Sequence, residues 1–287
     1  MLITLTVLYF LGIIGKYQTL QDSNTEKDST ELLEIWERKN YQEVNTLCEE
    51  ILSVHPLNYE ALIFNGFSYF YRGIGQFSLE ERLPFIDAAI VNLRKALTLH
   101  EDNLNGKLNY ILGKAYYQKG KFYSDLSLKY LEESIDSGYI GEDTYEYLGL
   151  VYSSLSDYEA SAENYIKALE VNPSDTLYLA LAQTYYQMND LVKAEEYSIW
   201  SLNSTRDFTV EEKSRFLLGK IYTDREEYLK AEEQYLKILE NNSNSADVRY
   251  YLGEIYDALG NSTKARFEWR KALEIDPYHY GARLKLY

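Results

Sequence analysis

Apolar residues recur along most of the chain at intervals of three and four positions, which is the spacing of one face of an α-helix. Around Leu148, for example, Gly149 and Tyr152 continue such a face, and the polar turn Ser156-Asp157 ends it. Only 4 of the 287 residues are Pro while 30 are Tyr, so helix breakers are few and bulky packing groups are many. The pattern predicts an all-α chain of short amphipathic helices.

This helical pattern is repetitive. A Leu followed by a small residue, with Tyr three positions after the small residue, returns through the chain. The copies are Leu112-Gly113 with Tyr116, Leu148-Gly149 with Tyr152, Leu181-Ala182 with Tyr185, Leu218-Gly219 with Tyr222, Leu252-Gly253 with Tyr256 and, more weakly, Asn65-Gly66 with Tyr69. Successive small residues stand 47, 36, 33, 37 and 34 positions apart. Self-similarity at such a period indicates stacked structural repeats.

A second pattern follows each of these copies. It consists of Ala, then an aromatic or aliphatic residue four positions later, then a small or aliphatic residue three positions after that. Examples are Ala231/Tyr235/Ile238 and Ala265/Trp269/Ala272, and Pro56, Pro173 and Pro277 each stand five residues past the last position. The two patterns predict a helical hairpin in which the small residue lets two helices approach closely. One hairpin cannot bury its own apolar face, so neighbouring hairpins must stack.

The combined pattern resembles the tetratricopeptide repeat family, with its 34-residue period and its L-G-x2-Y…A-x3-F…A-x4-P signature. The resemblance covers roughly residues 25–287 and implies a right-handed superhelical solenoid of about seven helix-turn-helix repeats with a short C-terminal capping helix. The repeats are placed at 25–58, 59–103, 106–141, 142–174, 175–208, 212–245 and 246–279, with the cap at 280–287. The first repeat departs from the signature, because Leu32 stands where the small residue belongs.

Residues 74–84 are interpreted as an insertion in the second repeat. Ser78 and Glu81 have the spacing of a capping box, so we expect a short extra helical turn there. Pro84 would then lie in the first turn of the following helix. The insertion could form one wall of a binding site, or it could be a tolerated surface loop.

The N-terminus differs in composition from the repeats. Residues 2–15 carry no charge, and as a helix they would cover roughly 21 Å, less than the ~30 Å hydrocarbon core of a membrane. They are interpreted as a hydrophobic N-terminal segment (1–15) that is an anchor, part of a signal peptide, or a helix packed on the solenoid. Residues 16–29 are polar and are interpreted as a linker, which leaves 30–287 as the solenoid. We therefore expect a membrane-associated, bacterial protein with extracytoplasmic repeats; the alternative is a cytoplasmic protein.

In the tetratricopeptide family, the first helix of each repeat lines a concave groove that commonly receives a peptide or a partner helix. By this resemblance, a set of aromatic, basic and amide side chains faces the groove. The expected groove residues are Phe67, Phe70, Tyr71, Tyr110, Lys114, Tyr117, Gln183, Tyr186, Phe216, Lys220 and Tyr250, together with Lys107, Gln118, Gln187 and Lys213. Tyr and Phe with a few charges suit peptide recognition, although some of these aromatic residues could simply pack against the neighbouring repeat.

The family's best-known ligand mode clamps a C-terminal carboxylate with a Lys at the fifth position of a repeat and an Asn at the ninth. No repeat of this chain has that pair, because the third has Tyr110 and Lys114 and the sixth has Phe216 and Lys220 at these places. The resemblance therefore does not imply a clamp of that type. The groove lysines could instead contact acidic positions of a ligand.

Charge narrows the choice of partner. The formal net charge is −16, which argues against nucleic acid because binding to phosphates needs clustered Lys and Arg. Residues 21–60 hold ten acidic and three basic residues, whereas 249–287 hold five acidic and seven basic ones. These ends could favour head-to-tail oligomers, or they could be ordinary solvated helix faces. The expected partner is a protein or peptide, with membrane contact possible through residues 2–15.

The sequence offers no recognisable catalytic or metal-binding constellation. His55, His100 and His279 are far apart, and no metal-ligand spacing, phosphate loop or nucleophile elbow is present. Cys48 occupies a packing position and is interpreted as a small buried hydrophobic residue. We expect no enzymatic activity, no cofactor and no metal. The preferred function is a non-catalytic scaffold; the alternative is a structural subunit of an envelope or secretion assembly that acts through the ends of its solenoid.

Overall fold

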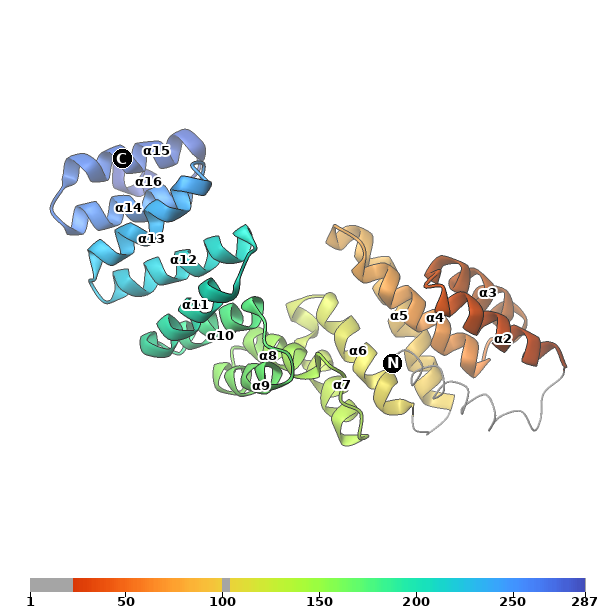
Figure 1. Cartoon of the computed structure of the whole chain (residues 1–287). Coiled ribbons are helices and arrows are strands. Elements are labelled where there is room, and N and C mark those ends of the chain that lie inside the picture. The colour runs from red at the N-terminus through yellow and green to blue at the C-terminus, as the bar shows by residue number, and fades with distance from the viewer. Residues whose placement is uncertain (1–22, 100–103, 287) are drawn as a thin grey trace. The chain divides into compact units, whose positions relative to one another are not determined.

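The structure, a computed structural model, describes residues 23–99 and 104–286, and all regular elements among them are helices (Figure 1). The hydrophobic segment 1–15 and His100 lie outside the described residues. Within the described part, no helix is both long enough and apolar enough to cross a membrane.

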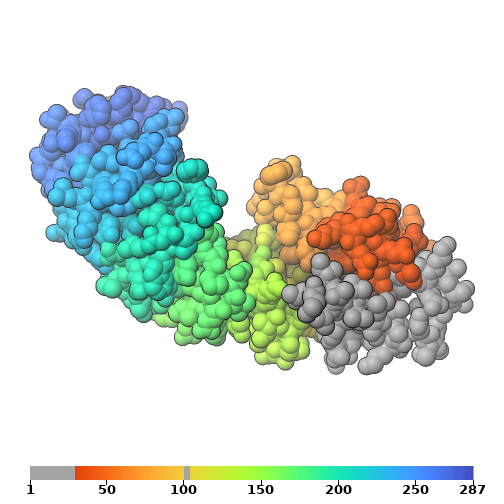
Figure 2. All heavy atoms as spheres, in the orientation of Figure 1, coloured from red at the N-terminus to blue at the C-terminus, as the bar shows by residue number. Residues whose placement is uncertain are grey.

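The chain divides into two compact units. The N-terminal unit (Met1–Gly141) contains α2 (Ser23–Glu37), α3 (Tyr41–Val54), α4 (Tyr59–Ile74), α5 (Leu79–Leu99), α6 (Asn105–Gln118), the 3₁₀ turn η1 (Lys121–Tyr123) and α7 (Ser124–Asp136). The C-terminal unit (Glu142–Tyr287) contains α8 (Thr144–Leu155), α9 (Tyr158–Val171), α10 (Asp175–Gln187), α11 (Leu191–Ser204), α12 (Phe208–Asp224), α13 (Tyr228–Asn241), α14 (Ala246–Ala258), α15 (Ser262–Ile275) and α16 (Tyr280–Leu286). Inside each unit, helices pair in sequence order and each pair packs on the next. In Figure 2, segments that follow one another in the sequence therefore lie next to one another along each unit, as the order of the colours shows.

The turns inside four of the helix pairs follow a common local design. A residue in the left-handed region comes first, as at Ser156 (φ 66°), Asn189 (φ 59°) and Gly260 (φ 77°). An Asp or Asn follows it and accepts a hydrogen bond from the backbone N–H three residues on, which caps the next helix. The capping residues of this kind are Asn40, Asp157, Asp190 and Asn261. Polar turns of this kind thus start the second helices α3, α9, α11 and α15.

The small residue of the first helix brings the two helices of a pair into close contact, as the sequence pattern predicts. A Cβ atom on Gly149 would lie 2.6 Å from the ring of Tyr165, and one on Gly219 would lie 2.5 Å from Tyr235. The facing residue always comes from the second helix and is large and buried. The pairs are Gly66 with Leu93, Gly113 with Leu131, Gly149 with Tyr165, Gly219 with Tyr235 and Gly253 with Trp269.

Two boundaries differ from the sequence-based expectation. Helix α2 begins at Ser23, so residues 23–29 of the predicted linker are helical. Once the apolar stretch at Leu32 and Leu33 is packed, each further turn costs little because helix propagation is easier than nucleation. Helix α5 begins at Leu79, and Pro84 lies inside it rather than in its first turn.

The inserted residues 74–84 do contain the predicted capping box. The Ser78 Oγ accepts from the Glu81 N–H at 3.2 Å, and the Ser78 N–H donates to the Glu81 carboxylate at 3.4 Å. The extra turn is continuous with α5, because the box starts that helix and not a separate one. Arg82 donates to the Gln118 side chain at 2.8 Å and to the Gln76 carbonyl at 3.1 Å, which holds the inserted turn against the end of α6.

Tyr hydroxyls link successive pairs at their polar edges. Tyr222 donates to Glu195 at 2.8 Å, and Tyr256 donates to Glu232 at 2.5 Å. Arg225 also pairs with Glu195. Partial burial works to raise the pKa of Glu195, but the hydrogen bonds from Tyr222 and Arg225 outweigh it and hold this pKa below its usual value.

Replacement of Glu195 by Gln is therefore expected to destabilise the protein by about 1 kcal/mol at pH 7. A carboxyl with a lowered folded-state pKa contributes stability above its unfolded pKa of about 4.3 and loses it as the pH falls through the folded value. The difference in urea midpoint between wild type and Glu195→Gln should thus be present at pH 7 and vanish near pH 3. Glu196→Gln, an exposed neighbour on α11, is the matched control. An equal difference at both pH values would contradict the assignment.

Candidate functional site

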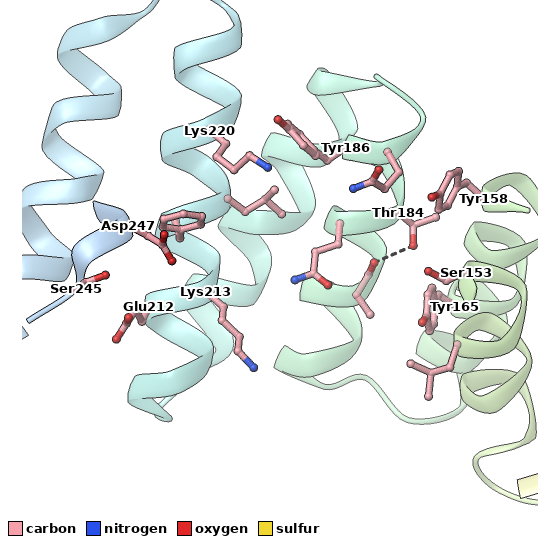
Figure 3. A pocket seen from close by; sticks show the side chains of 16 residues that line it. Ser153, Tyr158, Tyr165, Thr184, Tyr186, Glu212, Lys213, Lys220, Ser245 and Asp247 are labelled. Carbon is pink, nitrogen blue, oxygen red and sulfur yellow. Dashed lines mark hydrogen bonds between the residues drawn. The ribbon is translucent and has the colours of Figure 1, made fainter. Parts of the chain in front are cut away.

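The C-terminal unit contains an open groove of about 660 Å³. Its walls are the first helices of successive pairs, α8, α10 and α12, with the start of α14 at one side and α9 contributing two tyrosines (Figure 3). The lining residues are Leu150, Ser153, Tyr158, Tyr165, Ala180, Gln183, Thr184, Tyr186, Gln187, Glu212, Lys213, Phe216, Leu217, Lys220, Ser245 and Asp247. This volume lies in the usual range for ligand sites, roughly 300–1,000 Å³.

One wall carries a fixed aromatic and cationic pair. The Tyr186 hydroxyl donates to Asp224 at 2.7 Å, and the Lys220 Nζ lies 4.6 Å from the centroid of the Tyr186 ring. Burial, followed by the hydrogen bond to Asp224, raises the pKa of Tyr186, so its hydroxyl stays protonated and remains a donor. Phe216 is held by the rings of Tyr235 and Tyr251, at centroid distances of 5.8 and 5.3 Å. The aromatic floor is therefore rigid.

Other polar side chains of the groove are engaged within the protein. The Glu212 carboxylate accepts from the Asn242 amide at 3.2 Å, and Asp247 pairs with the His279 Nε2 at 3.0 Å. The Thr184 hydroxyl donates to the Ala180 carbonyl at 2.9 Å, the bond drawn in Figure 3. His279 also caps α16, because its Nδ1 accepts from the Ala282 N–H at 3.1 Å. These groups shape the groove without needing a ligand.

The structure brings four of the expected groove residues together in this one place: Gln183, Tyr186, Phe216 and Lys220. Lys213 and Gln187, expected on the same grounds, join them. Tyr250 does not line this groove. Its ring packs instead on His279 at 5.1 Å and on Tyr251 at 5.3 Å, against the C-terminal helix α16. Tyr250 therefore helps to seat α16 on the last pair.

The expected groove residues of the N-terminal unit lie elsewhere. Phe67, Phe70 and Tyr110 are 2%, 0% and 9% exposed, so the expectation that they project into a groove is corrected. The helix pairs pack closely enough here to bury these three aromatic side chains. Lys114 is half-buried, with its Nζ 3.1 Å from the Tyr110 hydroxyl, and Tyr117 is half-buried on α6.

Tyr71 is a partial exception in that unit, since 36% of its side chain is exposed. Its ring nevertheless stacks on Tyr41 at 5.1 Å and meets the edge of Trp36 at 5.9 Å. Trp36 stands on α2, the first helix of the degenerate first repeat. Tyr71 thus serves to anchor that repeat.

Sequence reasoning missed several lining residues, among them Tyr158 and Tyr165 of α9 and Asp247 of α14. The family resemblance assigned the groove to particular positions of first helices, so it left out α9 altogether and did not include Asp247 of α14. Tyr165 belongs to the packing pattern and is 2% exposed, and nothing in the pattern indicates that it also borders the groove. Whether such a residue borders the groove depends on how closely the neighbouring helices pack.

The described residues show no evident catalytic centre. Among them, no group of three or more His, Cys, Asp or Glu side chains is arranged to hold a metal ion. Cys48 is fully buried, and this burial raises the pKa of its thiol, which keeps it protonated. The interpretation of Cys48 as a packing residue is confirmed by that burial.

Comparisons with known proteins agree with this architecture. Residues 143–175 and 246–279 each match the family described as tetratricopeptide repeat. No curated protein sequence matches the chain. Among solved structures, the C-terminal part of a TPR repeat-containing protein from Cytophaga hutchinsonii is 14% identical, with a TM-score of 0.65 over 90% of this chain and 99% of that one.

Two further structures show the same fold. YrrB, described as a TPR protein with an unusual peptide-binding site, is 19% identical, with a TM-score of 0.55 over 67% of this chain and 96% of its own. PilF of Pseudomonas aeruginosa is 16% identical, with a TM-score of 0.58 over 76% of this chain and 95% of its own. The fold is an all-helical solenoid of paired helices, as in these structures, and the chain contains tetratricopeptide repeats at residues 143–175 and 246–279.

Proposed function

We propose that this protein is a non-catalytic scaffold that binds a segment of a partner protein in the groove between α8 and α14. The observation that carries this proposal is the combination of an open 660 Å³ groove with a rigid aromatic floor and exposed polar side chains along its walls. Aromatic groups held in place give contact area without a large loss of side-chain entropy. The peptide-binding site described for YrrB, which has the same fold, supports the same function here.

A crosslinking pull-down with the full chain tests this proposal. Partners captured by the wild type should be lost when Tyr186 and Phe216 are both replaced by Ala, because these changes remove most of the floor. The matched control is Tyr278→Ala, since Tyr278 is 82% exposed and does not line the groove. Equal capture by wild type, groove variant and control would defeat the proposal, provided that circular dichroism shows the groove variant to be folded.

A membrane tether through residues 2–15, with the repeats outside the cytoplasm, is part of this proposal. Its support is the uncharged apolar composition of that segment. Fusion of a reporter that is active only outside the cytoplasm to the C-terminus should give signal, and the same fusion lacking residues 2–15 should not. Signal from a cytoplasm-specific reporter instead would assign the alternative location.

The ends of the chain support assembly as the second candidate function. On the terminal helix α16, Tyr280 and Leu284 are 76% and 64% exposed. An apolar surface at the end of a repeat array can stack on another molecule. A mass that rises with concentration in light scattering, and falls back in Leu284→Glu, would favour this function over groove binding.

A further inference from the structure

We propose that the groove recognises an extended, acidic peptide segment, in which two carboxylates bind Lys213 and Lys220 and the main chain binds Gln183 and Gln187. This inference rests on the proposed function of the same groove and adds the chemical class and conformation of the ligand. It applies to an internal segment, because recognition uses side chains and main chain and does not need a terminal carboxylate.

The two lysines share one face of α12. They are seven residues apart, so their Cα atoms stand about 10.5 Å apart along two helical turns, with Phe216 on the same face between them. Neither lysine has a carboxylate within ion-pair distance among the described residues. Two lysines without such ion pairs on one wall of the groove can bind an anionic ligand.

The carboxylates of the groove lie on its other side. In Figure 3, Lys213 extends toward α10, whereas Glu212 points the opposite way and Asp247 lies in the first turn of α14. Glu212 and Asp247 are also already paired with Asn242 and His279. Beside the channel between α10 and α12, the Asp224 carboxylate accepts the hydrogen bond of Tyr186. Lys213 and Lys220 are thus the charged lining residues that face this channel, and an acidic segment would lie there.

Two glutamines form the facing wall of this channel. Gln183 and Gln187 stand four residues apart on α10, on one face of that helix, and both are exposed. Their amides have no hydrogen-bond partner among the described residues. Each amide can donate to a carbonyl and accept from an N–H, so together they match the groups of an extended main chain. A helical ligand satisfies these groups internally, which makes an extended segment the better fit.

The spacing of the lysines sets the spacing of the ligand carboxylates. An extended segment in the polyproline II conformation advances about 3.1 Å per residue with three residues per turn. A separation of about 10.5 Å therefore corresponds to acidic residues three positions apart, and these point to the same side of the segment. A residue between them would lie over Phe216 and Tyr186, and an apolar side chain suits that floor. The expected ligand is acidic at two positions and apolar between them.

Fluorescence anisotropy with synthetic peptides and the full chain tests this inference. The probe is a labelled, C-terminally amidated peptide with two Asp three positions apart, a Pro and a Leu between them, and Gly-Ser flanks. Comparison peptides carry Asn in place of both Asp, or place the two Asp on an Ala-rich helix. We expect the extended Asp peptide to bind at least tenfold more tightly than either comparison peptide.

The protein variants sharpen the result. Lys213→Gln and Lys220→Gln should each weaken binding of the Asp peptide about tenfold and leave the Asn peptide unaffected, since each removes one charged hydrogen-bond partner. Lys121→Gln, at an exposed lysine of η1 outside the groove, is the matched control and should bind like the wild type. Binding should also weaken with added salt, because Lys213 is exposed.

Other outcomes overturn the inference in distinguishable ways. Equal binding of the Asp and Asn peptides, or tighter binding of the helical peptide, would overturn the acidic or the extended character of the ligand. Failure of all three peptides to bind would overturn the inference as well. The scaffold function would survive each of these results if the Tyr186/Phe216 variant still loses its partners in the pull-down, and it would fall only if that variant keeps them.

Discussion

Replacement of Gly253 by Ala is expected to lower the free energy of unfolding by about 2 kcal/mol. A Cβ atom at this position would lie 2.2 Å from the Trp269 Nε1 and 2.4 Å from its Cδ1, far inside contact distance. The indole cannot easily move, because Trp269 is 4% exposed and packed in the core of the C-terminal unit. The clash outweighs the gain of up to about 1 kcal/mol that Ala offers over Gly inside a helix.

Chemical unfolding followed by circular dichroism measures this effect, and two further variants make it specific. Gly75→Ala is the control, since the nearest atom to its added Cβ would be 3.5 Å away and the backbone there is helical. In a Trp269→Ser background, Gly253→Ala should leave the free energy of unfolding almost unchanged. The chain already contains an Ala opposite a Ser at the corresponding positions of another repeat. Ala182 stands sixteen residues before the buried Ser198, as Gly253 stands sixteen residues before Trp269. A similar cost in both backgrounds would show that the contact with Trp269 is not the cause.

Replacement of Phe70 by Ala is expected to destabilise the N-terminal unit by about 4 kcal/mol and to leave ligand binding unchanged. Phe70 is fully buried, so its removal leaves a cavity as well as losing apolar contact. The groove is built from the C-terminal unit alone, so its residues keep their positions. Urea unfolding and peptide binding, measured on the same sample, test both halves of this expectation.

Phe77→Ala is the matched control for that experiment, because the Phe77 side chain is fully exposed in the inserted turn. It should change stability by less than about 0.5 kcal/mol. If Phe70→Ala instead weakened binding without loss of stability, Phe70 would be a groove residue, as the family resemblance implies. That outcome would reject the packing described for α4.

Most of the architecture follows from local patterns. The spacing of Leu, the small residue and Tyr predicts the first helix of each pair, and the turns at Ser156-Asp157 and Gly260-Asn261 mark the starts of second helices. These signals are local, since helix caps and helix faces depend on residues a few positions apart. Two boundaries differ from the sequence-based expectation: α2 extends back to Ser23, and α5 already starts at the Ser78–Glu81 capping box, so that Pro84 lies inside it.

The groove could be predicted only in part. The repeat positions of the first helices predicted four lining residues, Gln183, Tyr186, Phe216 and Lys220, because the same positions recur in each repeat. The same positions placed Phe67, Phe70 and Tyr110 in a groove, yet these side chains are buried. Equivalent positions differ in exposure because exposure depends on how deeply neighbouring helices pack, which residues far apart in the sequence decide.

The sequence by itself determined that this chain folds into paired helices with a small residue facing a large one, since that information lies within about 34 residues and repeats. Only the tertiary structure decided which of the equivalent first-helix positions remain exposed to solvent. In the C-terminal unit it leaves Lys213 and Lys220 facing a channel and turns Glu212 away from it, while in the N-terminal unit it buries Phe70 at the corresponding face. The physical reason is that burial and charge pairing are set by contacts between repeats, whereas helix formation is set within them.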